Sequence, residues 1–159
     1  RQNVLAGVRA GRANTATGST FIGYESGIVN TNGDFNTAVG CSTAYNNTLG
    51  GLNSFFGKEA GFSNTTAHRN TFLGAFSGWT NDMGERNTFA GFNSGFSNLD
   101  GHHNTFVGNQ SGQSNFSADQ NSFFGDLSGI NTVDGSFNTF IGAGTGNINT
   151  FGTFNTCLG

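Results

Sequence analysis

This chain contains no proline, and charged residues make up only 9% of its 159 positions. Without proline, each residue keeps the backbone N–H that an uninterrupted ladder of hydrogen bonds requires. The low charge is accompanied by 13% aromatic residues, a combination that argues against intrinsic disorder. The net charge is −3 and there is no basic run, so the sequence predicts no nucleic-acid partner and no anionic membrane surface.

Long apolar runs and disulfide candidates are missing as well. No apolar stretch approaches the roughly 18 residues of a membrane span, so we expect no membrane insertion, and the first residues show no signal-peptide pattern. The two cysteines, Cys41 and Cys157, are seven repeats apart, which is about 34 Å if each repeat adds one strand. That distance is far beyond the reach of a disulfide, so the two cannot bridge within one chain.

A short motif, Asn-Thr-Phe-x-Gly, dominates the sequence instead. The first step between copies is 16 residues and the other eight are 17. A repeat this short fits one coil of a β-solenoid better than a helix pair, which needs about thirty residues or more. We therefore predict an all-β protein, a parallel β-solenoid (β-roll) of about nine 17-residue coils that forms a single repeat domain over residues 1–159. The copies begin at Asn3, Ser19, Asn36, Asn53, Asn70, Asn87, Asn104, Asn121, Asn138 and Asn155.

Corners of the coil are predicted by numbering the repeat from 1 to 17, starting at its Asn. Gly fills position 5 in every copy and predominates at positions 9 and 15. Because Gly readily adopts positive φ, we predict corners at all three positions. Stacked Asn amides at position 1 can bond along the solenoid, which predicts an Asn ladder. The predicted position 5 corners are Gly23, Gly40, Gly57, Gly74, Gly91, Gly108, Gly125 and Gly142. The predicted Asn ladder is Asn36, Asn53, Asn70, Asn87, Asn104, Asn121 and Asn138.

The strand between positions 1 and 5 is apolar on both faces, because neighbouring strand residues point in opposite directions. Small residues at positions 8 and 9 suit a wall packed against Phe rings, so we predict position 3 inside the coil and positions 2 and 4 outside. The predicted Phe stack is Phe21, Phe55, Phe72, Phe89, Phe106, Phe123 and Phe140. The predicted subunit seam at position 4 is Ile22, Val39, Phe56, Leu73, Val107, Phe124 and Ile141.

An apolar row of this length is too large to leave in water, and a second copy of the same row is its simplest cover. We therefore expect a homo-oligomer, most simply a trimer, or an end-to-end filament. The alternative is a monomer whose own loops cover the row, although connections of two or three residues are too short for that. The chain begins two residues before one motif and ends on the Gly of another, so we expect a segment of a longer fibre.

The pattern Asn-Thr-Phe-Ile-Gly, followed by x-x-Ser/Ala-Gly and x-x-Asn-x-x-Gly, resembles the repeats of bacterial and phage surface fibres. These include tail-fibre-like proteins. More distantly, it is similar to the head repeats of trimeric autotransporter adhesins, which are parallel β-rolls that trimerise. The longer repeat and the bulky Phe depart from those heads. The resemblance implies a structural fibre outside the cell, at a cell or virion surface. It also implies adhesion as a further role, with a glycan or host surface as a further partner.

The charged residues at position 16 give only weak support for a metal site. At position 16, His68, Glu85, His102 and Asp119 fall on successive coils and could ligate a metal ion. Alternation of sign, which avoids stacking like charges about 4.8 Å apart, explains the same row without a metal. The sequence assembles no catalytic constellation, so we expect no cofactor and no enzymatic activity.

Two other functions remain open. Thr predominates at position 2, and a regular hydroxyl array of this kind resembles an ice-binding solenoid. The array is Thr20, Thr37, Ser54, Thr71, Thr88, Thr105, Ser122, Thr139 and Thr156. A carbohydrate-binding adhesin head would instead use aromatic residues, namely Tyr24, Tyr45, Phe62, Trp79 and Phe96.

Overall fold

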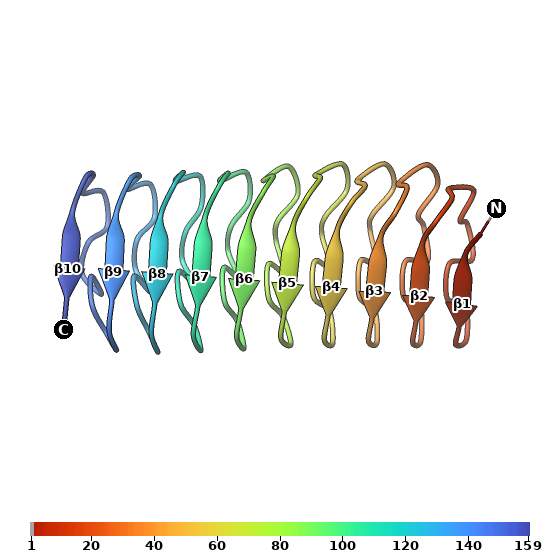
Figure 1. The fold of residues 1–159 in the computed structure, drawn as a ribbon, viewed down its shortest axis with the longest axis horizontal. Helices are drawn as coiled ribbons and strands as arrows, with labels where there is room; N and C mark the ends of the chain where they lie inside the picture. Colours follow the sequence, from red (N-terminus) through yellow and green to blue (C-terminus); the bar gives the residue numbers. More distant parts are fainter. Residues whose placement is uncertain (1) are drawn as a thin grey trace.

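The computed structural model describes residues 2–159, which form a rod of stacked coils with one short strand per coil (Figure 1). The strands lie side by side in chain order, so the two ends of the described chain are at opposite ends of the rod. No helix occurs among the described residues. The strands are β1 (Val4–Ala6), β2 (Thr20–Ile22), β3 (Thr37–Val39), β4 (Ser54–Phe56), β5 (Thr71–Leu73), β6 (Thr88–Ala90), β7 (Thr105–Val107), β8 (Ser122–Phe124), β9 (Thr139–Ile141) and β10 (Thr156–Leu158).

All ten strands form one parallel sheet in which each strand pairs with its neighbours in the chain. Equal positions of the repeat lie opposite each other, as where Thr71 pairs with Thr88 and Phe72 with Phe89. The predicted all-β parallel β-solenoid of about nine 17-residue turns is therefore confirmed. The constant repeat length produces this register, because any other pairing would carry the apolar positions out of line.

The core is a single file of Phe rings from position 3. Phe72, Phe89 and Phe106 are each 0% exposed, and neighbouring rings in this run lie 4.8–4.9 Å apart. Their planes are within 3–5° of parallel, so the rings stack face to face along the rod. Position 9 forms the opposite wall: a Cβ added to Gly78 would meet the Phe72 ring at 2.4 Å. Each ring therefore fills the width of its coil.

Coil 3 departs from this packing in two positions at once. Its position 3 residue is Ala38, which interrupts the stack between Phe21 and Phe55, and its position 9 residue is Ala44 rather than Gly. Both alanines are buried in the core. Because no ring lies opposite Ala44, its methyl group can occupy space that a Phe fills in the other coils.

The corner after each strand is a Gly at position 5 with φ near +130 to +143°, as at Gly74 with φ 138°. A Cβ at Gly74 would lie 2.5 Å from the carbonyl oxygen of Gly91 in the next coil. Position 9 also adopts positive φ, even where the residue is Ala44. At both positions the required conformation is one that L side chains adopt with strain.

The predicted corner at position 15 was wrong. Gly50 and its equivalents do not have positive φ, and Ala67 and Ala118 occupy the same position. These residues are small because two Asn side chains approach them: the Nδ2 groups of Asn36 and Asn47 both donate to the Gly50 carbonyl, at 2.7 and 2.9 Å. Close approach, rather than backbone conformation, selects a small residue there.

Two further corners lie at positions 7 and 17, which carry no Gly signature. Phe76 and Arg86, for example, both have φ of 58°. Backbone bonds to the preceding coil support this conformation, since Phe76 N–H donates to the Lys58 carbonyl at 2.9 Å and Arg86 N–H to the His68 carbonyl at 3.2 Å. The ladder thus holds ordinary residues in the left-handed region, which the residue types alone do not reveal.

Candidate functional site

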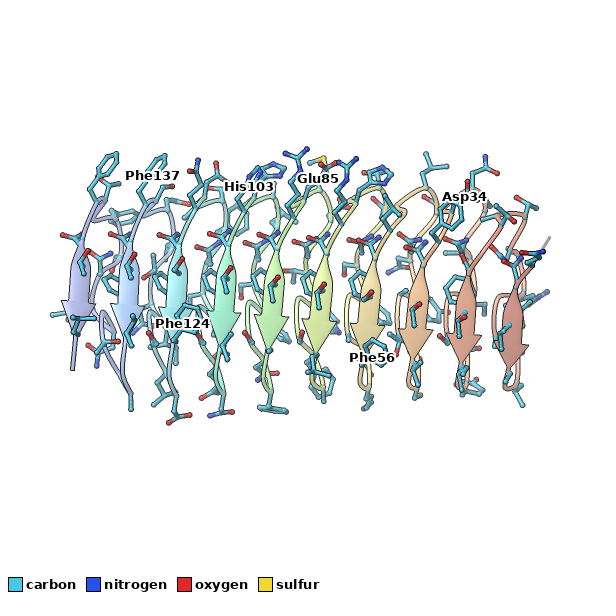
Figure 2. All side chains as sticks on the ribbon, in the orientation of Figure 1. Asp34, Phe56, Glu85, His103, Phe124 and Phe137 are labelled. Atoms are coloured by element: carbon cyan, nitrogen blue, oxygen red, sulfur yellow. The ribbon has the colours of Figure 1, made fainter. Side chains whose placement is uncertain are left out.

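The outer face of the sheet, defined by the side chains at strand positions 2 and 4, is the most regular surface of the molecule. Figure 2 views this face with the strands in front. Position 4 is apolar throughout, and Phe56, Leu73 and Ile141 are 39%, 55% and 46% exposed. Each buried Phe of the core is thus followed by an apolar side chain on the outer face, as the alternation of a strand requires.

The hydroxyls at position 2 lie beside this apolar row. Thr71 and Thr88 are exposed, and Thr105 is half-buried. Among the described residues, these strand hydroxyls have no hydrogen-bond partner within the protein, in contrast to the Thr hydroxyls elsewhere in the coil such as Thr31 and Thr48. The outer face therefore offers an apolar row and a row of free hydroxyls to whatever covers it.

Side chains at position 16 accept hydrogen bonds from backbone N–H groups. His68 Nδ1 accepts a hydrogen bond from Gly51 N–H at 2.9 Å, and His102 Nδ1 accepts one from Glu85 N–H at the same distance. An Asp119 carboxylate oxygen accepts from His102 N–H at 2.6 Å. Each of these three side chains thus satisfies a backbone N–H group of the coil before it. Among residues 2–159, no three His, Cys, Asp or Glu side chains are grouped as metal ligands.

Two Asn ladders satisfy the interior of the rod. At position 1 the side chain bonds to backbone: Asn70 Oδ1 accepts from Asn87 N–H at 2.9 Å, and Asn70 Nδ2 donates to the Gly84 carbonyl at 2.8 Å. Amide-to-amide bonding occurs instead at position 12, where Asn98 Nδ2 donates to Asn81 Oδ1 at 2.7 Å. Both rows are buried, so each amide supplies contacts that water cannot.

The position 12 ladder is interrupted at Thr132. Asn115 Oδ1 and Thr132 Oγ1 are both buried without a hydrogen-bond partner. In the other coils, the amide of the next Asn donates to this oxygen, as Asn115 Nδ2 does to Asn98 Oδ1 at 2.6 Å. A Thr side chain is too short to span the gap between coils, so one acceptor is left unsatisfied.

We expect Thr132→Asn to stabilise the protein by about 1–2 kcal/mol, because an amide at this position satisfies the buried Asn115 oxygen. Thermal unfolding followed by circular dichroism measures the change. The matched control is Asn81→Thr, which introduces the same interruption in the middle of the ladder and should lower stability by about 1–3 kcal/mol. A decrease in melting temperature for Thr132→Asn would contradict this account of the gap.

The aromatic residues proposed for carbohydrate binding form a second stack at position 10. The ring centroids of Tyr45, Phe62, Trp79 and Phe96 lie 5.0, 5.4 and 5.3 Å apart in succession, with planes within 13° of parallel. The structure does not bring Tyr24, which is at position 6, into this stack. Because each inner ring has its faces covered by its neighbours, the row presents ring edges to solvent. Sugar rings pack on exposed aromatic faces, so this geometry does not favour a glycan site here.

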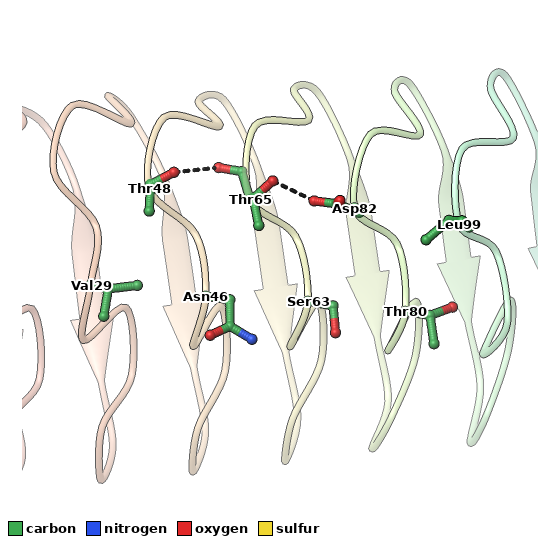
Figure 3. A pocket seen from close by; sticks show the side chains of 8 residues that line it. All are labelled: Val29, Asn46, Thr48, Ser63, Thr65, Thr80, Asp82 and Leu99. Atoms are coloured by element: carbon green, nitrogen blue, oxygen red, sulfur yellow. Dashed lines mark hydrogen bonds between the residues drawn. The ribbon is translucent and has the colours of Figure 1, made fainter.

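A shallow groove of about 630 Å³ runs along another face of the coils, between the rows at positions 11 and 13 (Figure 3). Its polar lining includes Thr48, Thr65 and Asp82, with Val29 and Leu99 at its ends. The Thr48 hydroxyl donates to the Thr65 carbonyl at 3.2 Å, and the Thr65 hydroxyl donates to Asp82 Oδ1. These two hydroxyls therefore bond within their own row.

Ionisable groups interact directly in the first two coils. The Glu25 carboxylate, which is nearly buried, pairs with Arg9 at 2.6 Å. The hydrogen bond and charge of Glu25 raise the pKa of the Arg9 guanidinium, and interaction with the same carboxylate raises the pKa of the exposed Tyr24 hydroxyl. Both effects are local responses chiefly to one carboxylate.

Comparison with known proteins gives no match: no protein family, curated protein or solved structure is detectably similar to this chain. The described residues also contain no helix that is long and apolar enough to cross a membrane. The function must therefore be argued from the surface itself.

Proposed function

We propose that this chain is a non-enzymatic structural unit of a surface fibre, which associates with copies of itself through the outer face of the sheet. The exposed apolar row at position 4 carries the proposal. It extends from Ile22 to Leu158, and a continuous row of this kind is typical of a surface that another protein covers.

The shape of the molecule supports a structural role. A rod held by a continuous parallel ladder and a file of buried rings is suited to be a spacer with two ends. Placement outside the cell, at a cell or virion surface, is part of the same proposal. The parallel trimer of adhesin heads is one way to cover the row, and a filament is another.

Replacing Val107 and Ile141 with Asp tests the proposal. Both side chains project from the outer face, so we expect the coil to remain folded while self-association weakens at least a hundredfold. The physical reason is that each copy would bury two unpaired carboxylates in an apolar contact. Removing each of these ions from water costs roughly several kcal/mol. Sedimentation equilibrium measures the association, and circular dichroism measures the fold.

The matched control is Phe116→Asp with Ile148→Asp, which introduces the same charge at exposed apolar residues away from the outer face. This variant should associate as the parent chain does. If the unmodified chain sediments as a monomer at high concentration, the seam does not exist and the proposed function is wrong.

Ice binding is the second candidate, and the free hydroxyls of position 2 favour it. They form an in-register row of exposed and half-buried residues along the sheet. The neighbouring position 4 row is uneven, however, since Ala90 lies between bulkier residues such as Leu73 and Val107. Thermal hysteresis measured on the chain, with Thr88→Leu as the altered variant, separates ice binding from self-association.

A further inference from the structure

Two strands of the outer face differ from the others in the same way. β4 and β8 both read Ser-Phe-Phe, so each has Ser in place of Thr at position 2 and an exposed Phe at position 4. Phe56 and Phe124 are each 39% exposed and are labelled in Figure 2. β6 lies midway between them, two strands from each.

Only two residues at position 6 are charged. They belong to the coils of β4 and β8, and their charges have opposite signs. Lys58 follows β4 and Asp126 follows β8, each two residues after the exposed Phe. Both residues are exposed. A second copy that runs in the opposite direction, related by a two-fold axis through β6 along the strands, places coil 4 opposite coil 8. Lys58 of each copy then faces Asp126 of the other.

The remaining positions of the outer face match themselves under this operation. Position 2 reads Thr, Thr, Ser, Thr, Thr, Thr, Ser, Thr, Thr from β2 to β10, which is the same in both directions. At position 4, Phe56 meets Phe124, Leu73 meets Val107, and the outer strands pair aliphatic with aliphatic.

The edge of the face before the strands matches in part, although Leu52 there comes opposite Gln120. Phe35 and Phe137, which are 57% and 43% exposed, precede strands that lie equally far from β6. Glu85 and Arg86 precede β6 itself, so each can meet the opposite charge across the axis. Arg69 comes opposite His103, whose ring already lies beside a guanidinium, since Arg86 Nη1 is 3.1 Å from its Nε2.

The core and the position 10 row lack this symmetry: Ala38 is opposed by Phe140, and Trp79 by Gln113. The self-match is thus confined to residues that project from the outer face or border it. An arrangement with parallel copies in register would instead hold each Lys58 level with another Lys58, and each Asp126 level with another Asp126.

The size of the face is sufficient for such a contact. The nine strands that this operation pairs, β2 to β10, lie about 4.8 Å apart and give a length of roughly 38 Å. A width of at most about 20 Å then gives on the order of 800 Å² per copy, the amount that each partner contributes to a standard stable interface.

We infer that the outer face binds a second copy of this chain running in the opposite direction, centred on β6. This inference rests on the proposed self-association. It adds that contact occurs between oppositely directed rods, which is the geometry in which fibres projecting from two facing surfaces meet.

Cross-linking tests the direction of the second copy. Thr37→Cys and Thr139→Cys are made in separate chains that lack Cys41 and Cys157, and are then mixed with a short bis-maleimide. The antiparallel pair brings β3 of one copy against β9 of the other, so a linked heterodimer should form in high yield. In parallel copies the two positions are six coils apart, about 29 Å, and no heterodimer should form.

The matched control uses Thr48→Cys and Thr150→Cys, which lie in the same two coils but away from the outer face. They should not link in the antiparallel pair. If the chain self-associates but the heterodimer is absent, or if the control pair links equally well, the antiparallel contact is wrong while the proposed function stands. If the chain is monomeric, both fail.

Charge exchange provides a second readout. Lys58→Asp places like charges together twice per dimer and should weaken association on the order of tenfold at low salt, while Lys58→Asp with Asp126→Lys should restore it. Failure of the double exchange to restore association would overturn the pairing of these two residues.

Discussion

Gly74→Val should unfold the solenoid or lower its stability by at least about 3 kcal/mol. A β-branched residue at φ 138° is strained by about 1–3 kcal/mol before any contact is considered. Its Cβ would also lie 2.5 Å from the Gly91 carbonyl oxygen, which belongs to the backbone of the next coil. That coil cannot move away without lengthening the bond from Gly91 N–H to the Leu73 carbonyl, now 2.8 Å.

The neighbouring residue supplies the control for this prediction. Ala75 follows Gly74 and is half-buried, and φ is not positive there. Ala75→Ser should therefore leave the melting temperature within a few degrees of the parent. Thermal unfolding by far-ultraviolet circular dichroism compares the two variants. Equal melting temperatures for the two variants would contradict the requirement for Gly at the position 5 corner.

Phe89→Ala should cost about 3–5 kcal/mol, because it opens a cavity in the middle of the core. The Phe89 ring is 0% exposed and stacks on Phe72 at 4.9 Å and on Phe106 at 4.8 Å. Loss of both stacking contacts adds to the loss of buried area. Chemical denaturation with urea measures the free energy of unfolding directly.

Coil 3 indicates how the cavity can be partly filled. Gly95 is the wall residue opposite Phe89, and a Cβ there would lie 2.5 Å from the ring. Gly95→Ala alone should thus be strongly destabilising. Combined with Phe89→Ala it should be tolerated, because the pair then reproduces Ala38 and Ala44. Simple addition of the two single effects would contradict the proposed packing between positions 3 and 9.

The repeat, by itself, determined the architecture of this protein. A constant 17-residue step with Phe at position 3 and Gly at position 5 leaves one register that stacks like on like, and the structure has that register. The same pattern also indicated which side of the strand is inside. A coil this thin has room for one row of large side chains, and the small residues at positions 8 and 9 lie opposite the Phe row.

Only the tertiary structure determined the hydrogen-bond partners of the repeated Asn positions and the backbone conformation of the repeated Gly positions. Asn occupies positions 1 and 12 alike, yet the side-chain oxygen at position 1 accepts from a backbone N–H of the next coil, whereas the one at position 12 accepts from the amide of the next Asn. Gly occupies positions 5 and 15 alike, yet only position 5 has positive φ. Residue type states what a position tolerates, whereas its partner depends on where the next coil places its carbonyls and amides.

The candidate site shows the same division. The sequence supplied the apolar row of position 4 and the Thr row and predicted both outside the coil, but it did not show how accessible the aromatic residues and the position 16 side chains are. Stacking along the rod covers the faces of Phe62 and Trp79, and the bend of each coil turns the position 16 side chains onto backbone N–H groups. The outer face stays open because its strands lie in register at the surface of the rod and no connection of the same chain crosses over them.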